Sequence, residues 1–150
     1  NLARLLAKRG EYVEADKLLA AADGPDAMTA TAHLAWRSAT HPDERHRSAA
    51  RAIAQAERVR KQAGDKWARG LDILAAAYAE AGRFEDAATT ANLAVAAAVN
   101  AKDQKLAEAI KVRLEGYRQQ QPFRDADLAK PPAKPPAAVN PPALKQPSAK

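Results

Sequence analysis

The chain has 150 residues, of which about 40 are alanine and only 5% are aromatic, and it carries a net charge of +6. This composition argues against a β-sandwich or β-barrel and favours closely packed helices within one domain. The absence of cysteine excludes a disulfide scaffold, thiolate zinc sites, iron–sulfur clusters and a cysteine nucleophile.

Glycines and polar residues divide the first 120 residues into seven segments with helical spacing of apolar residues. Gly10 and Gly82 are typical of turns between helices, and Ser48 is typical of an N-cap, as is Asp103. Two further aspartates, Asp26 and Asp65, are also expected to cap the helices that follow them. No segment alternates with period two, so no strand is predicted. The predicted helices cover residues 1–9, 12–22, 26–39, 49–63, 66–81, 84–101 and 104–120.

A helix–turn–helix unit repeats along these segments. Residues 75–87, AAAYAEAGRFEDA, align with residues 3–15, ARLLAKRGEYVEA, so that Gly82 matches Gly10. Leu-Ala pairs recur at residues 2–3, 34–35, 74–75 and 106–107, and alanines recur at 15, 52 and 87. Such spacing is near the ~34-residue period of helical hairpin repeats, which stack because one hairpin cannot bury its apolar face alone.

Residues 71–99 resemble a tetratricopeptide repeat (TPR). The consensus-like residues are Leu74, Ala75, Tyr78, Gly82, Phe84, Ala87, Ala91 and Ala94. More specifically, LAWRSATHPDERHRSAARAIAQAERV followed by LDILAAAYAEAGRFEDAATTANLA resembles the terminal repeats of planctomycete-type bacterial proteins, with departures at His41 and at Ser48-Ala49.

The resemblance implies an all-α fold, a right-handed α-solenoid over residues 1–124. Its units would be a partial repeat at 1–22, repeats at 26–63 and 66–102, and a capping helix at 104–120. Because the chain opens inside a helical pattern without methionine, we expect it to be a piece of a longer protein. The resemblance implies no particular ligand.

Residues 125–150 are rich in proline, alanine and lysine and are predicted to form an extended tail. Seven of the ten prolines lie at or after Pro131, and four lysines but no acid lie from Lys130 onward. Proline removes backbone donors and restricts the preceding residue, which favours polyproline II. Two interpretations stay open, a solvated linker and a docking strip for a partner. The docking residues would be Lys130, Pro131, Pro132, Lys134, Pro135 and Pro136.

The sequence offers little catalytic chemistry. It contains no Gly-rich phosphate loop, GxSxG or HExxH motif, and His33, His41 and His46 lack the spacing of a metal site, which favours surface or loop histidines. Almost all carboxylates are expected on solvated helix faces. Asp72 and Glu80 are expected to approach one another only loosely, and nothing in the sequence indicates a shifted pKa for either. The prediction is therefore a chain that is not an enzyme and has no metal or cofactor.

A basic stretch in the middle of the chain invites a nucleic-acid interpretation. Its members are Arg45, Arg47, Arg51, Arg58, Arg60 and Lys61. Glu57 is interleaved, aromatic residues for base stacking are absent there, and the first 129 residues hold 20 basic and 18 acidic residues. A solvated outer face is therefore the favoured interpretation.

The family resemblance implies a partner-binding groove lined by the first helix of each repeat. The residues placed there are Arg4, Lys8, Trp36, Thr40, Asp72, Ala76, Glu80, Glu108 and Lys111. Trp36 is either a partly exposed binding hot spot or packed beneath the loop 41–47. The Lys and Asn residues of the two-carboxylate clamp in chaperone-binding members are missing, so binding of chaperone tails is not implied.

The expected function is a non-catalytic protein–protein interaction scaffold or assembly subunit that binds a protein or peptide. Two alternatives stay open, a self-assembling filament or ring subunit and an accessory domain of a larger enzyme. The sequence does not assign a compartment, although the resemblance and the tail favour the bacterial envelope or the extracellular space.

Overall fold

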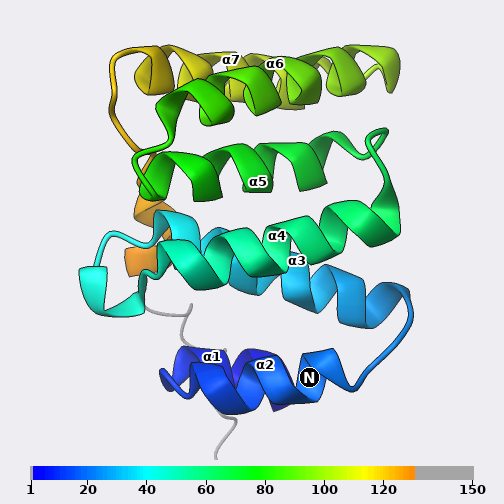
Figure 1. Ribbon diagram of the computed structural model, residues 1–150, viewed down its shortest axis with the longest axis vertical. Coiled ribbons are helices and arrows are strands. Elements are labelled where there is room, and N and C mark those ends of the chain that lie inside the picture. The colour runs from blue at the N-terminus through cyan, green and yellow to red at the C-terminus, as the bar shows by residue number, and fades with distance from the viewer. Residues whose placement is uncertain (1, 131–150) are drawn as a thin grey trace, which may run out of the picture.

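The computed structural model describes residues 2–130, and these residues are all-helical, without a strand. Figure 1 shows the helices stacked in layers, from α1 and α2 at one end to α6 and α7 at the other. The α-helices are α1 (Leu2–Lys8), α2 (Tyr12–Ala20), α3 (Pro25–Thr40), α4 (Ala49–Ala63), α5 (Ala68–Glu80), α6 (Phe84–Asn100) and α7 (Gln104–Arg118). Two short 3-10 helices are η1 (Glu44–His46) and η2 (Ala126–Ala129). The docking residues predicted at 131–136 lie outside the described residues.

Local signals define most of the helix ends. The side chain of Ser48 accepts a hydrogen bond from the Arg51 amide, and Asp103 accepts one from the Leu106 amide, which confirms both predicted caps. Gly10 and Gly82 adopt positive φ values of 83° and 75°, as turn glycines do.

Two predicted caps are wrong. Helix α3 begins at Pro25 after Gly24, so Asp26 lies inside its first turn. Helix α5 begins at Ala68 rather than at residue 66, and Asp65 instead accepts a hydrogen bond from Arg60 Nε at 2.6 Å. A backbone N–H at the first helical position has no partner within the helix, so proline, which lacks this group, is well suited to that position. This explains the earlier start of α3.

The recurring alanines are the contact points between helices. Ala15, Ala52 and Ala87 are fully buried, and so are the alanines of the pairs at 34–35, 74–75 and 106–107. Their small side chains let neighbouring helices approach closely. Three apolar clusters result, shared by α1–α3, by α3–α5 and by α5–α7.

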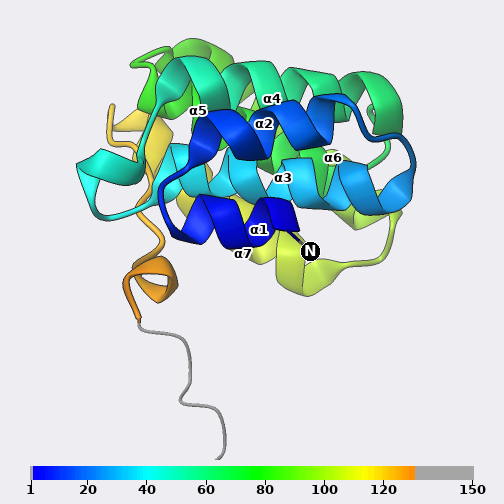
Figure 2. The same ribbon diagram turned by 90° about the horizontal axis from the view of Figure 1, so that it is seen from below.

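After α7 the chain returns along the stack. We call residues 122–130 the return segment; its η2 lies on the side of α1 and away from α2 and α4 (Figure 2). The Asp125 amide donates to the Thr40 carbonyl at 2.9 Å, and Leu128 packs against the cluster of α3–α5. The predicted tail start at 125 therefore falls inside a segment that packs on the helices.

Among the described helices, none has the length and hydropathy that a membrane crossing requires.

Candidate functional site

The predicted groove residues divide into an interior set and a surface set. Trp36, Thr40, Asp72 and Ala76 are buried, and Glu80 is half-buried. The expectation that these four buried side chains form an open contact surface is wrong, because helices and the return segment cover them. The exposed members are Arg4, Lys8, Glu108 and Lys111.

Asp72 is held inside the stack by an arginine of α7. The side chain of Asp72 is fully buried, and Arg113 donates to both of its oxygens, from Nη2 to Oδ2 at 2.6 Å and from Nε to Oδ1 at 3.0 Å. Burial raises the pKa of Asp72, and the Arg113 guanidinium opposes that rise. The expectation of a solvated carboxylate with an ordinary pKa is wrong here.

Glu80 joins three parts of the chain. Its Oε1 lies 3.0 Å from Arg47 Nε, and its Oε2 lies 2.7 Å from Arg124 Nη1 of the return segment. Both ion pairs are largely shielded from water by the surrounding side chains. Glu80 is therefore a structural link between the loop before α4, helix α5 and the return segment.

Trp36 lies beneath the return segment rather than beneath the loop 41–47. Its indole Nε1 donates to Asp125 Oδ2 at 2.8 Å, and the ring of Phe123 lies 5.7 Å away between centroids. The Arg113 guanidinium lies 5.3 Å from the Trp36 ring centroid, and only 9% of Trp36 is exposed. Both interpretations drawn from the sequence are corrected by this contact between residues 89 positions apart.

The return segment does not cover the part of the predicted groove that lies near the hairpin of α1 and α2. Four basic residues, Arg4 and Lys8 of α1 and His33 and Arg37 of α3, line a pocket of about 170 Å³; we call them the basic strip. The pocket is also lined by Ala7, Leu34, Trp36 and Leu128. Within residues 2–130, none of the four forms an ion pair with a carboxylate. Burial lowers the pKa of His33, and the nearby Arg4 and Arg69 lower it further.

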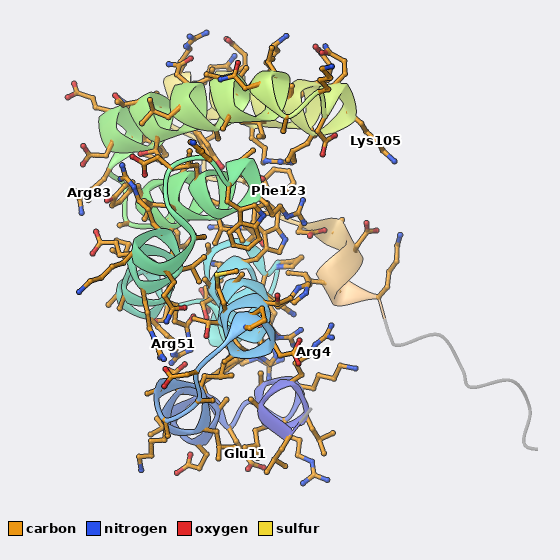
Figure 3. All side chains as sticks on the ribbon, turned by 90° about the vertical axis from the view of Figure 1, so that its right-hand side faces the viewer. Arg4, Glu11, Arg51, Arg83, Lys105 and Phe123 are labelled. Carbon is orange, nitrogen blue, oxygen red and sulfur yellow. The ribbon has the colours of Figure 1, made fainter. Side chains whose placement is uncertain are left out.

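Sequence reasoning missed His33 and Arg37 as members of this surface. They stand four residues apart on one helix, with Trp36 between them, so their shared face was detectable. Figure 3 places Arg4 on the side of the return segment and Arg51 on the opposite side.

The basic stretch of the middle region is mostly engaged in internal contacts. Arg51 pairs with Asp16 at 3.6 Å and lies 4.5 Å above the Tyr12 ring, while Arg58 donates to the Leu19 carbonyl at 2.8 Å. These side chains attach the first hairpin to α4. The expectation of a solvated outer face is wrong for Arg51 and Arg58.

His41 is buried rather than a surface residue. It is 5% exposed, its ring centroid lies 4.4 Å from that of His46, and His46 Nδ1 is hydrogen-bonded to the Tyr12 hydroxyl. Burial lowers the pKa of both histidines, and Arg37 lowers it further. In the described part of the chain, no three histidine or carboxylate side chains gather as metal ligands would.

The exposed large apolar side chains lie at the two ends of the stack. Within the described residues they are all on α1, α2, α6 and α7, and none lies on α3, α4 or α5. They are Leu2, Leu5, Val13, Leu18, Leu93, Val99 and Val112.

Comparison of the chain with protein-family models, with curated proteins and with solved structures gave no match. The resemblance to TPRs therefore stays a prediction.

Proposed function

We propose that the chain is a non-catalytic interaction scaffold, built as a right-handed solenoid of TPR-like hairpins, and that it binds a protein segment on the face of α1 and α3. The stacking of consecutive hairpins through recurring alanines supports the repeat. The observation that carries the function is the basic strip. Its cations Arg4, Lys8 and Arg37 line an apolar pocket together with His33, and none of these residues has a carboxylate partner in residues 2–130.

The partner binds in the open half of the predicted groove. Arg4 and Lys8 are the predicted groove residues that contact the partner, and Trp36 forms part of the pocket lining. The exposed pair of Glu108 and Lys111, 2.9 Å apart, lies on the cap and is a secondary contact in this proposal, as is the tail after Lys130. The buried Asp72 is not available for acid–base chemistry because Arg113 occupies both of its oxygens.

Selection of peptides from a random display library against the folded chain tests this function. The proposal expects ligands whose addition shifts the NMR signals of Arg4, Lys8, His33 and Arg37. Failure to select any specific peptide, or footprints confined to α4 and α6, would contradict it.

A self-assembling subunit is the second candidate, favoured by the exposed apolar side chains at both ends of the stack. Sedimentation velocity over a hundredfold concentration range tests it. Self-assembly predicts larger species that Val13→Glu and Val112→Glu each remove, whereas a monomer at all concentrations eliminates this candidate.

A further inference from the structure

A second hollow lies at the other end of the helices, where α5 and α7 begin. It has a volume of about 480 Å³, and Trp67, Ala68, Leu106 and Ala109 contribute to its apolar lining. An adjoining hollow of about 450 Å³, which shares Lys66, continues along α6 past Leu93. The two together form an elongated apolar surface, which suits an extended segment better than a compact small molecule.

Trp67 is held in place at the wall of this hollow. A Cβ atom at position 70 would lie 2.7 Å from the Trp67 ring, so only glycine lets the ring pack this closely on α5. The side chain is half-buried, and its indole N–H makes no hydrogen bond within the described residues. Trp67 therefore combines a fixed ring with a free donor, the combination that favours tryptophan at binding hot spots.

The rim of the hollow is positively charged. Lys66, Arg69 and Lys105 line it, are exposed, and form no ion pair with a carboxylate in residues 2–130. The carboxylate in the lining, Asp103, already accepts the Leu106 amide at 3.0 Å. The adjoining Asp65 is paired with Arg60. An incoming carboxylate would therefore meet cations that lack a carboxylate partner.

The geometry points to a docking surface around Trp67 for an acidic segment of a partner protein that also carries a large apolar side chain. This inference rests on the proposed scaffold function and adds a second surface to it. Lys105 lies in the end layer of the stack, away from Arg4 near the first hairpin (Figure 3), so the two surfaces have different centres. Arg69 lies between them, because its guanidinium lies 5.5 Å from the Trp36 ring centroid. The occupant is not the proline-rich end of this chain, because residues 131–150 contain three lysines and no acid. The apolar lining matches side chains rather than a sugar–phosphate backbone.

The test is an NMR titration of the whole chain with a synthetic twelve-residue peptide of aspartate and glutamate with two leucines. We expect the indole N–H signal of Trp67 to shift while that of Trp36, already bonded to Asp125, stays in place. Lys66→Glu/Lys105→Glu should weaken binding by about tenfold or more, and raising the salt concentration should weaken wild-type binding.

The matched control is Arg9→Glu/Lys61→Glu, which makes the same change in net charge at exposed residues outside the hollow. It should alter the affinity by no more than about twofold. Trp67→Phe, which keeps a smaller aromatic ring but removes the donor, should weaken binding, while circular dichroism should show that the fold is retained.

Several results would overturn the inference. One is a set of NMR shifts that lies away from Trp67, and another is an equal loss of affinity in the two double variants. A third is binding at Trp67 of a single-stranded oligonucleotide, octanoate or a lysine–leucine peptide with an affinity equal to or higher than that of the acidic peptide. If display selection yields ligands on the basic strip while the acidic peptide leaves Trp67 unchanged, the scaffold function stands and this inference fails. If acidic ligands bind at Trp67 and no ligand binds on the basic strip, this inference stands and the proposed function on the basic strip fails.

Discussion

At the scale of single residues, the buried pair of Asp72 and Arg113 ties α5 to α7. A buried charge is costly when its partner is removed, because the remaining ion is left without compensation. The sequence pattern could not reveal this pair, since the residues are 41 positions apart and each is ordinary in its own helix. Long-range pairing of this kind leaves no local signal.

Arg113→Met should lower the free energy of unfolding by about 3–5 kcal/mol, because it leaves the Asp72 carboxylate buried and unpaired. Urea unfolding at pH 7 measures the change. In the double variant Asp72→Leu/Arg113→Met most of the lost stability should return, since no charge remains in the interior. A double variant as unstable as the single one would show that Arg113 acts through packing on Trp36 and Phe123 instead.

His41, which is buried, and His46, which is half-buried, predict how stability depends on pH. Burial, and then Arg37, lower the pKa of His41 and His46 in the folded state, so the unfolded chain binds protons first as the pH falls. Their contribution is thus fully present above the unfolded pKa of about 6.5 and is lost as the pH falls through the folded values.

The free energy of unfolding should therefore fall between pH 7 and pH 5, as measured by urea titration at intervals of half a pH unit. The variant His41→Gln/His46→Gln should show a flatter dependence over the same range. An unchanged slope in that variant would assign the dependence to other groups.

At the scale of elements, the turns were predictable and the return segment was not. Gly10, Gly82, Ser48 and Asp103 carry local conformational signals, and the structure confirms each of them. The return segment has no periodicity, and its contacts reach residues more than 80 positions earlier. Its proline-rich continuation made an extended tail the natural prediction from residue 125 onward.

Gly82→Ala should destabilise the chain by about 1 kcal/mol, because residue 82 has a φ of 75° while space for a methyl group is open. Gly116→Ala is the control, since this glycine lies inside α7 and a Cβ would make an ordinary contact of 3.6 Å with the Gln121 carbonyl oxygen. That change should stabilise the chain by up to about 1 kcal/mol. Thermal unfolding of both variants measures the two changes in stability, which should have opposite signs. Changes of the same sign would show that the positive φ of residue 82 does not determine the effect.

The hydrogen bond between Trp36 and Asp125 anchors the return segment. Trp36→Phe keeps an aromatic ring but removes the donor, and should cost about 1.5–3 kcal/mol. Asp125→Ala should cost somewhat more, because the Asp125 side chain also accepts a hydrogen bond from the Asp127 amide at 3.0 Å. Because both changes remove the bond between Trp36 and Asp125, the double variant should lose little more stability than Asp125→Ala alone in urea unfolding. Fully additive losses would show that the bond does not hold the segment.

At the scale of the whole molecule, the face that was predicted to form the groove is divided into two parts. The return segment covers Trp36 and the region toward α7, while the basic strip on α1 and α3 stays open. The family resemblance led to the face itself and to Arg4 and Lys8, but not to the segment that closes part of it. A partner segment is therefore expected on the open part alone.

The central claim is that this open part binds a protein segment while the return segment stays in place. An NMR titration of the uniformly labelled chain with one display-selected peptide tests it most directly. We expect shifts at Arg4, Lys8, His33 and Arg37, while the Trp36 indole signal does not move toward the position it has in Asp125→Ala. Binding that leaves the basic strip unaffected, or that moves the Trp36 indole to the position it has in Asp125→Ala, would contradict it.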